Sequence, residues 1–398
     1  MSKLSYLEKL LNEAKFEWKN LSDVARIKNG KDHKSLGEGK FPVYGSGGIM
    51  RYADNYAYNK SSVLIPRKGS LGNLFFVDVP FWTVDTIFYT EIDEAQIRPK
   101  YLYYFLTTVG LGDMNQAGGV PSQTQSVLNK LKIPVPCPDN PEKSLAIQSE
   151  IVRILDKFTA LTAELTAELT AELNMRKKQY NYYRDQLLSF DNEDVPHLPM
   201  GQKDIGEFIR GGTFQKKDFM DAGVGCIHYG QIYTYYGTYT KKTKTHISAA
   251  LAKKCKKAQK GNLIIATTSE NDEDVCKAVA WLGSDDIAVS SDACIYKHNL
   301  NPKYVSYYFQ TEQFQNQKRQ YITGAKVRRV NADNLSKILI PVPSMAVQER
   351  IVSILDKFDT LTNSITEGLP REIELRQKQY EYYRDLLFSF PKPETASN

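Results

Sequence analysis

The sequence predicts an α+β protein made of two similar halves, each a β-rich globular domain followed by a long helix. The first observation behind this is a repeat: residues 151–190 align without a gap on residues 351–390, and 23 of the 40 pairs are identical. The second is that the repeated segments carry apolar residues at helical spacing. The third is that the sequences before them contain short β-branched and aromatic runs typical of strands.

Length and composition agree with two folded domains. The 398 residues exceed the ~250–300 at which a single core stops growing, and the chain is 41% hydrophobic and 25% charged. We find no apolar run near the ~18 residues of a membrane span and expect no signal peptide. Five scattered cysteines fit a reducing compartment, so we expect a cytoplasmic protein. A net charge of +6 is compatible with nucleic-acid binding.

The globular parts contain the predicted strands and short helices. The strand predictions fall on residues 63–66, 74–77, 86–89, 263–266 and 293–296. Residues 101–107 and 303–314 are predicted to be helical.

The repeated segments predict long helices. Residues 144–190 contain no Gly or Pro, with apolar residues close to a seven-residue pattern, and residues 151–190 alone would span ~60 Å as a helix. Ser144 and Ser344 are predicted N-caps. Gly368 and Pro370 predict a kink or break in the second copy. Two amphipathic helices in one chain most simply pack on each other.

Within the first helix, Thr-Ala-Glu-Leu occurs three times in succession. Its threonines and leucines are Thr162, Leu165, Thr166, Leu169, Thr170 and Leu173. Replication slippage that duplicated a good helix-forming segment explains the repeat. The number of copies would also set the length of the helix. The resulting domain prediction is residues 1–143, helix 144–190, residues 191–343, helix 344–390 and a tail, 391–398.

A search for catalytic and metal-binding motifs finds little. The Gly-rich segment 44–48 lacks the third glycine of a dinucleotide loop and the Gly-Lys of a P-loop, so a turn between strands is favoured. Motifs of an amino-methyltransferase or a metal nuclease are absent from the sequence. The pairs Cys226 with His228 and Cys294 with His298 lack the doublet spacing of a zinc site, and buried cysteines with surface histidines are the simpler interpretation.

The arrangement resembles a known family. Trp18-Lys19-Asn20-Leu21, the segment 41–48, the Ile-Pro-Val-Pro motifs at 133–136 and 340–343, and the repeated 151–158 and 351–358 are similar to the specificity (S) subunits of type I restriction–modification enzymes. The resemblance covers essentially the whole chain. The triple Thr-Ala-Glu-Leu resembles the type IC branch, whose members carry a four-residue repeat between their halves.

The resemblance implies a fold and a set of partners. Each globular part would be a target recognition domain that reads half of a split site in double-stranded DNA, and the two helices would form an antiparallel coiled coil. Two methyltransferase subunits with S-adenosylmethionine and two restriction subunits with ATP and Mg²⁺ would supply the chemistry, so this chain would bind no cofactor and no metal, and would have no catalytic residue. Candidate methyltransferase contacts are Tyr180, Tyr182, Tyr183, Tyr380, Tyr382 and Tyr383. Packing within the coiled coil is the alternative for these tyrosines.

Basic and amide side chains supply the candidate DNA contacts. Residues 241–260 contain eight lysines and no acid, although a solvated lysine-rich surface is an alternative explanation. Gln123, Thr124 and Gln125, after Gly118-Gly119, and Arg328 and Arg329, after Gly324, are candidates for base contacts, because Gln suits adenine and Arg suits guanine. Phosphate contacts are predicted for Arg67, Lys68, Lys216, Lys217, Lys241, Lys242 and Lys244, and Lys326 belongs to the second basic run.

Two other classes of function remain open from the sequence alone. One is a coiled-coil scaffold that does not bind DNA, and the other is a fused DNA methyltransferase or nuclease. Sequence-selective binding that weakens with salt would separate the first from a specificity subunit, and methyl transfer by the isolated chain would reveal the second.

Overall fold

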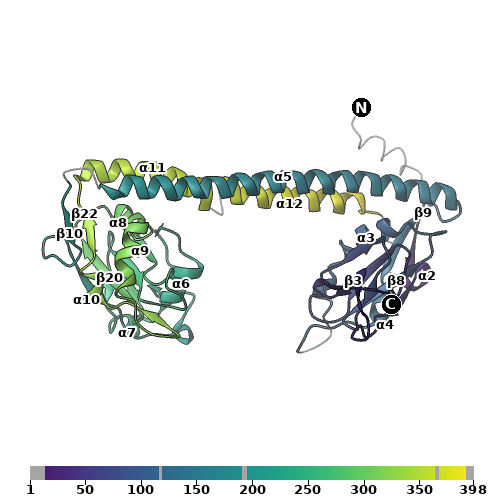
Figure 1. The fold of residues 1–398 in the computed structure, drawn as a ribbon, viewed down its shortest axis with the longest axis horizontal. Coiled ribbons are helices and arrows are strands. Elements are labelled where there is room, and N and C mark those ends of the chain that lie inside the picture. Colours follow the sequence, from purple (N-terminus) through teal and green to yellow (C-terminus); the bar gives the residue numbers. More distant parts are fainter. Residues whose placement is uncertain (1–13, 116–118, 191–194, 364–366, 391–398) are drawn as a thin grey trace. The chain divides into compact units, whose positions relative to one another are not determined.

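The structure, a computed structural model, describes residues 14–115, 119–190, 195–363 and 367–390. Gly118 and the predicted tail 391–398 therefore lie outside the described residues. The chain divides into two compact units: unit 1 comprises residues 1–167 and 374–398, and unit 2 comprises residues 168–373. Each unit combines a globular domain with parts of both long helical segments (Figure 1).

The described residues of unit 1 form three sheets. The largest has the strand order β2-β8-β5-β6, with all neighbours antiparallel. A second sheet, β4-β3-β7, joins an antiparallel hairpin to a parallel edge strand, and β1 pairs with β9. The strands are β1 (Phe16–Asn20), β2 (Ala25–Asn29), β3 (Glu38–Gly45), β4 (Gly48–Ala53), β5 (Ser62–Pro66), β6 (Phe75–Val77), β7 (Trp82–Thr83), β8 (Ile87–Ile92) and β9 (Lys132–Pro136).

Short helices connect these strands, and long helices cover one side of the domain (Figure 1). The short ones are α2 (Leu21–Val24), α3 (Pro99–Leu106), the 3₁₀ turn η1 (Leu111–Asp113) and α4 (Gln125–Leu128). The long helix α5 (Pro141–Ser189) belongs to unit 1 up to residue 167, and α12 (Gly368–Leu387) belongs to it from residue 374.

Unit 2 has a five-stranded sheet of order β11-β20-β16-β18-β13 and a four-stranded sheet of order β14-β12-β19-β15. Two strand pairs, β10-β22 and β17-β21, complete it. The strands are β10 (His197–Pro199), β11 (Gly206–Arg210), β12 (Val224–Ile227), β13 (Tyr239–Thr240), β14 (Thr245–Ile247), β15 (Lys257–Ala258), β16 (Leu263–Ala266), β17 (Thr268–Ser269), β18 (Ala278–Trp281), β19 (Ile287–Val289), β20 (Ala293–His298), β21 (Arg328–Arg329) and β22 (Leu339–Pro341).

The helices of unit 2 follow a similar plan. They are the 3₁₀ turn η2 (Lys216–Asp218), α6 (Tyr229–Thr234), α7 (Ala249–Ala252), α8 (Pro302–Tyr308), α9 (Glu312–Arg319), α10 (Ala332–Leu335) and α11 (Met345–Asn363). In both units a central antiparallel trio has the same order, β2-β8-β5 and β11-β20-β16, although the sequences differ. The two halves of the chain therefore share a fold as well as a repeated helix.

The cores of the two units also correspond. In unit 1, Ile151 and Leu155 of α5 pack with Phe388 and Phe390 beside α3 and the sheet. In unit 2, the repeat-related residues Ile351, Leu355 and Phe190 occupy the equivalent cluster. Each core thus takes the start of one helical copy and the end of the other, which the linear repeat alone does not reveal.

Several element boundaries differ from prediction. Ser144 is not an N-cap, because α5 begins at Pro141 and the Asn140 side chain accepts the Lys143 N–H at 3.0 Å. Pro is favoured in this first position of a helix. Ser344 does directly precede α11. The helix predicted over 303–314 is two helices, α8 and α9, separated at residues 309–311.

The predicted interruption of the second long helix is confirmed. α11 ends at Asn363, and α12 begins at Gly368, whose φ is +77°. A side chain at this position would be strained, and its Cβ would lie 2.5 Å from the Thr360 carbonyl oxygen. The break therefore depends on glycine, whereas α5 runs unbroken through the equivalent residues.

Candidate nucleic-acid interface

In unit 1, two segments predicted as separate DNA contacts lie side by side. The Arg67 N–H donates to the Thr86 carbonyl at 2.9 Å, and the Arg67 carbonyl accepts the Gln123 N–H at 3.0 Å. Lys68 and Ser122 form an isolated antiparallel β-bridge, and the Gly69 N–H donates to the Pro121 carbonyl at 2.8 Å. We call residues 67–69 and 121–125 the polar edge of unit 1, because they follow β5 and lead into α4.

Unit 2 repeats this arrangement with different side chains. The Thr267 N–H donates to the Asp292 carbonyl at 3.0 Å, and the Thr267 carbonyl accepts the Val330 N–H at 3.1 Å. Thr268 pairs with Arg329, as Lys68 pairs with Ser122 in unit 1. Residues 267–269 and 328–331 therefore form the polar edge of unit 2. The correspondence places Arg328 and Arg329 where unit 1 has Pro121 and Ser122.

A pocket of about 300 Å³ opens at the polar edge of unit 2. Arg210 and Arg329 line it, together with Thr268, Asp292 and Asn331. The Arg210 Nε–H donates to the Ser291 carbonyl at 3.1 Å, so backbone of the same pocket wall fixes this side chain. Two guanidinium groups beside hydroxyl and amide groups suit hydrogen bonding to phosphate or to base edges.

The candidate side chains at the polar edge of unit 1 differ in exposure. Gln123 is 2% exposed, and its Nε2 donates to the Pro66 carbonyl at 2.6 Å. In this structure Gln123 therefore holds the edge together, and its amide does not face solvent. Gln125 donates to the Asn29 side chain at 3.2 Å, and Thr124 directly precedes α4. The Arg67 guanidinium lies 5.6 Å from the Phe88 ring centroid, and Lys68 is exposed.

The remaining basic candidates of unit 2 lie on separate turns. Lys216 and Lys217 are exposed in η2, and Lys241 and Lys242 are exposed between β13 and β14. Lys244 Nζ lies 4.6 Å from the Tyr235 ring centroid. The exposed residue Lys326 lies in the turn that precedes β21.

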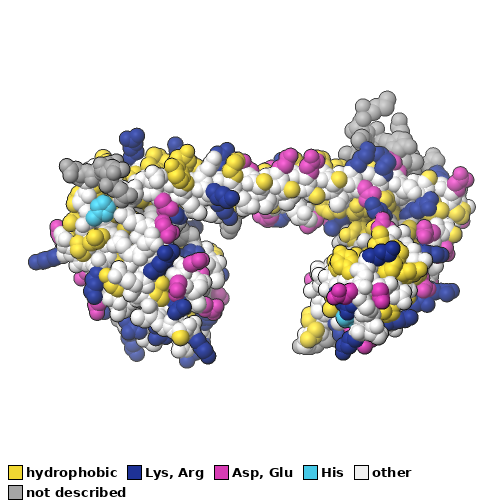
Figure 2. All heavy atoms as spheres, viewed as in Figure 1, with side chains coloured by type: hydrophobic (Ala, Val, Ile, Leu, Met, Phe, Trp, Pro, Cys, Tyr) yellow, Lys and Arg dark blue, Asp and Glu magenta, His cyan; other side chains and the backbone are white. Residues whose placement is uncertain are grey.

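Arg328 and Arg329 are adjacent in β21 but have different surroundings. The Arg328 Nε–H forms an ion pair with Asp272 Oδ1 at 2.7 Å, and its Nη1 donates to the Gly324 carbonyl at 2.6 Å. Arg329 lines the pocket instead. Figure 2 shows Lys and Arg side chains, mixed with acidic ones, at the end of each globular domain that lies away from its helices.

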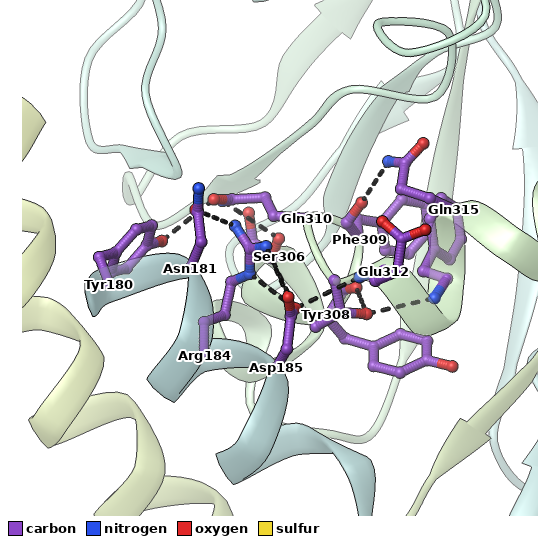
Figure 3. Close-up of polar contacts among 12 residues, drawn as sticks. Tyr180, Asn181, Arg184, Asp185, Ser306, Tyr308, Phe309, Gln310, Glu312 and Gln315 are labelled. Atoms are coloured by element: carbon purple, nitrogen blue, oxygen red, sulfur yellow. Dashed lines mark hydrogen bonds and ion pairs between the residues drawn. The ribbon is translucent and has the colours of Figure 1, made fainter. Parts of the chain in front are cut away.

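Tyr180 is the candidate partner contact that the structure buries. It is 4% exposed, and its hydroxyl donates to the Gln310 side chain at 3.1 Å (Figure 3). Close by, Asp185 Oδ1 accepts the Glu312 N–H at 3.2 Å and pairs with Arg184. Tyr180 therefore attaches α5 to the α8–α9 junction of the globular domain of unit 2, a role different from both packing within the coiled coil and contact with a partner.

The other tyrosines of the repeats divide into two groups. Tyr182 and Tyr382 are 61% and 64% exposed and occupy equivalent positions in the two copies. Tyr380 hydrogen-bonds Thr159 at 3.2 Å, Tyr383 stacks on Phe158, and Tyr183 packs beside Phe358. The repeat residues Leu165, Leu169 and Leu173 are partly buried along α5, as are Thr162 and Thr166, while Thr170 is exposed.

Sequence reasoning missed a contact that fixes each domain to its helix. In unit 1, Asp156 of α5 pairs with Lys100 Nζ at 2.9 Å and accepts the Tyr104 hydroxyl at 2.7 Å. In unit 2, Asp356 pairs with Lys303 and accepts the Tyr307 hydroxyl at 2.7 Å. The signal was available, because Asp156 and Asp356 lie in the repeat and Pro-Lys-Tyr recurs at 99–101 and 302–304. We call these contacts the aspartate latches.

Other features concern metals and membranes. Within the part of the chain that the structure describes, no cluster of three or more His, Cys, Asp or Glu side chains is arranged to hold a metal ion. All five cysteines are free thiols. No helix among the described residues has the length and apolar character needed to cross a membrane.

A protein-family model described as "Type I restriction modification DNA specificity domain" matches residues 13–175 and 199–375. The chain belongs to this type I specificity-subunit family. It is 41% identical over 413 residues to the type I restriction enzyme EcoR124I/EcoR124II specificity subunit of Escherichia coli, and the match covers all of both chains. It is 33% identical over 407 residues to the EcoprrI specificity subunit of the same organism, covering 92% of this chain and 93% of that one.

A solved structure supports the fold. A chain from a structure titled for the complex assembly and conformational transition of a type I R-M system aligns with a TM-score of 0.63 at 14% identity, covering 94% of this chain and 97% of that one. Family membership confirms two predictions made from the sequence: this is a DNA-specificity subunit of a restriction–modification complex, and it is not itself an enzyme. The scaffold and fused-enzyme alternatives are thereby set aside.

Proposed function

We propose that this specificity subunit reads a bipartite site in double-stranded DNA, with the domain of unit 1 reading one half and the domain of unit 2 the other. The observation that carries the proposal is the pair of polar edges, which share backbone hydrogen bonds but differ in side chains. A common frame with different side chains is what two readers of different half-sites require.

The side chains at each edge suggest different kinds of readout. Arg329, beside Arg210 in the pocket, suits a guanine or a phosphate, while Gln125 in unit 1 suits an adenine and Thr124 suits any base. Lys68 and the exposed lysines of unit 2 suit phosphate contacts, which position the protein without specifying sequence. Neither domain alone covers more than a few base pairs, so coupling two of them multiplies selectivity.

We further propose that the helical copies pair as an antiparallel coiled coil that sets the distance between the half-sites. Within unit 1 the support is the Phe158–Tyr383 stack and the Thr159–Tyr380 hydrogen bond. Within unit 2 it is the contact of Tyr183 with Phe358. In this proposal the number of Thr-Ala-Glu-Leu copies sets the length of the spacer.

The proposed partners are two methyltransferase subunits and two restriction subunits in the cytoplasm. The exposed, repeat-related pair Tyr182 and Tyr382 supports two equivalent docking sites for the methyltransferase subunits. S-adenosylmethionine, ATP and Mg²⁺ would be bound by those partners.

Exchange of one domain tests the two-reader proposal. Residues 16–132 are replaced by the matching segment of a relative with a known target, and methylated sites are mapped in cells that supply the methyltransferase subunits. We expect one half-site to change and the other, together with the spacing, to persist. A simultaneous change of both half-sites would contradict separate readers. Methyl transfer by the isolated chain with S-adenosylmethionine would contradict the non-catalytic role.

A further inference from the structure

The β3–β4 hairpin of unit 1 presents two large apolar side chains to solvent. The strands are joined by a two-residue turn, Ser46-Gly47, and Ile49 and Met50 directly beyond it are 48% and 59% exposed. The base of the same hairpin is fully buried at Val43 and Ala53. Ile49 and Met50 are therefore exposed although the hairpin that carries them is well packed at its base.

Hydrogen bonds hold the hairpin tip against the polar edge of unit 1. The Ser46 N–H donates to Thr86 Oγ1, and Asn73 Nδ2 donates to the Ser46 carbonyl, both at 3.4 Å. The Thr86 carbonyl in turn accepts the N–H groups of Arg67 and Lys68. A Cβ built on Gly69 would lie 3.4 Å from Ser46 Oγ, so the two segments are in direct contact. Aromatic packing of Tyr44 with Phe75 supports the tip from below.

The charge around the tip favours a polyanion. Arg67 and Lys68 lie on the adjacent segment, and Lys31 is held there by its N–H bond to the Thr83 carbonyl. Acidic residues also lie nearby, with Asp85 next to Thr86 and Asp32 next to Lys31, so the positive excess is carried by Arg67 and Lys68 on the segment beside the tip. Apolar side chains framed by cations match a DNA groove, where phosphates flank stacked bases that an apolar side chain can separate.

We propose that Ile49 and Met50 form a wedge that enters the minor groove and unstacks one base step at the half-site contacted by unit 1. The inference rests on the proposed function, because it assumes that the polar edge faces DNA. It adds a specific action, local distortion of the duplex, that hydrogen-bonding groups at the edge do not perform. Such wedges kink DNA and make recognition depend on how easily the step deforms.

Among the described residues of the globular domain of unit 2, no adjacent pair of large exposed apolar side chains matches Ile49 and Met50, and the exposed residues Met220 and Tyr235 beside β12 and α6 stand singly. Strand β12 of unit 2 pairs in parallel with β19 as β3 pairs with β7, with Ile227 beside Val289 and Tyr44 beside Thr83. After β12 the chain forms α6 where unit 1 makes the hairpin turn. Val120 and Val327, which lead into the two polar edges, are exposed in both units, so unit 1 is distinguished by the adjacency of Ile49 and Met50 on one hairpin strand and not by exposed apolar residues as such. The distortion is therefore expected at one half-site.

Permanganate footprinting tests the wedge, because the reagent oxidises unstacked thymines. The subunit is assembled with its methyltransferase subunits on a duplex carrying the mapped site, with A·T pairs flanking each half-site. Methyltransferases flip their target base, so the thymines left opposite the flipped adenines serve as an internal control in every sample. We expect one additional reactive step at or beside the unit 1 half-site.

Three variants make the test specific. In the Ile49→Ala/Met50→Ala double variant, the thymines of the additional step should react with permanganate only as much as in free duplex. The thymines opposite the flipped adenines should stay reactive. Ile49→Val/Met50→Leu should retain the additional reactive step. Val79→Ala removes an equally exposed apolar residue that follows β6 at the opposite end of the sheet and should have no effect. Because all these side chains are exposed, assembly of each complex provides the check on folding.

The outcomes separate this inference from the proposed function. If no additional step reacts, or if the double alanine variant leaves the pattern unchanged, the wedge is wrong even when methylation stays sequence-selective. If the domain exchange described above changes both half-sites, the two-reader proposal is wrong, whatever the footprint.

Discussion

Phe158 of α5 stacks on Tyr383 of α12 in unit 1, with ring centroids 5.6 Å apart and an interplanar angle of 3°. A shift of 200 residues converts this pair into Phe358 and Tyr183, which pack in unit 2 with centroids 5.8 Å apart. The same contact is thus made twice, with the two copies exchanging roles. Reciprocal contacts of this kind are what the proposed antiparallel pairing of the two helical copies requires.

The aspartate latches should contribute unequally to stability. In unit 1, Lys100 and Asp156 are both more than one-third exposed, so Asp156→Asn should cost roughly 1 kcal/mol or less. In unit 2 the pair is more buried, and Lys303 Nζ lies 3.6 Å from the Tyr239 ring centroid, so Asp356→Asn should cost about 1–3 kcal/mol. Thermal unfolding of the two variants beside the unaltered chain measures this order, and a larger loss for Asp156→Asn would contradict it.

Deletion of Thr170 to Leu173 should shorten the nonspecific spacer of the DNA site. Four residues remove ~6 Å of helix and ~40° of rotation beyond a full turn, which corresponds to about one base pair by rotation and nearly two by translation. We expect one base pair, since an error in rotation misplaces every groove contact. Methylated-site mapping should show unchanged half-sites. An unchanged spacer, or altered half-sites, would refute the length-setting role of the repeat.

Arg329→Ala should weaken binding to the mapped site more than Arg328→Ala. Arg329 lines the pocket of unit 2, while the Arg328 charge is already paired with Asp272. Loss of a base-contacting arginine costs about 1–3 kcal/mol, or roughly 5- to 150-fold in affinity. Gel shifts of the complex at several salt concentrations, with half-site variants as competitors, measure this. If Arg329 contacts phosphate instead, affinity will fall equally for all sequences and the salt dependence will decrease.

His298 should make the protein less stable in mild acid. Burial lowers the pKa of this imidazole from 6.5 to about 4, so the folded chain holds the neutral form while the unfolded chain takes up a proton below pH 6.5. Well above pH 6.5 neither state is protonated at His298, and the free energy of unfolding is unaffected. As the pH drops from 6.5 toward 4, protonation of the unfolded chain lowers the free energy of unfolding by up to ~3 kcal/mol.

Replacement of His298 provides the test of this pH dependence. His298→Phe should lower the loss of thermal stability between pH 7.5 and pH 5 relative to the unaltered chain, because Phe takes up no proton. The unaltered chain, measured over the same pH range in the same buffers, is the control. If the unaltered chain and His298→Phe lose the same thermal stability between pH 7.5 and pH 5, protonation of His298 does not contribute to the pH dependence of folding.

The sequence predicted the strands and the helical copies because their patterns are local. Residues 263–266 form β16, residues 63–66 lie within β5, and the interruption before Gly368 follows from the backbone freedom of one glycine. The start of α5 was missed because the seven residues 137–143, absent from the second copy, supply their own cap at Asn140. The separation of α8 from α9 was missed because Thr311 caps a new helix within an otherwise helical pattern.

The candidate site was predictable in composition but not in geometry. Residue type identified Arg67 and Gln123, yet backbone pairing between residues 56 positions apart decides that they share an edge and that Gln123 is buried. Arg210 was missed because it stands alone in sequence at the end of β11 and joins Arg329 through the fold. The exposed side chains Ile49 and Met50 were missed because a strand pattern does not reveal how far a hairpin extends beyond its sheet.

The core of unit 1 contains Phe388 and Phe390, and Phe16 stacks on Phe390 with ring centroids 4.2 Å apart. On the ribosome, the domain that is synthesised first therefore lacks part of its core until residues 374–390 have been translated. Unit 2 has no such delay, since its residues are contiguous from 168 to 373. During synthesis the second reader can complete its fold before the first, and a premature stop within α12 would release a chain whose first domain exposes an apolar cavity to chaperones and proteases.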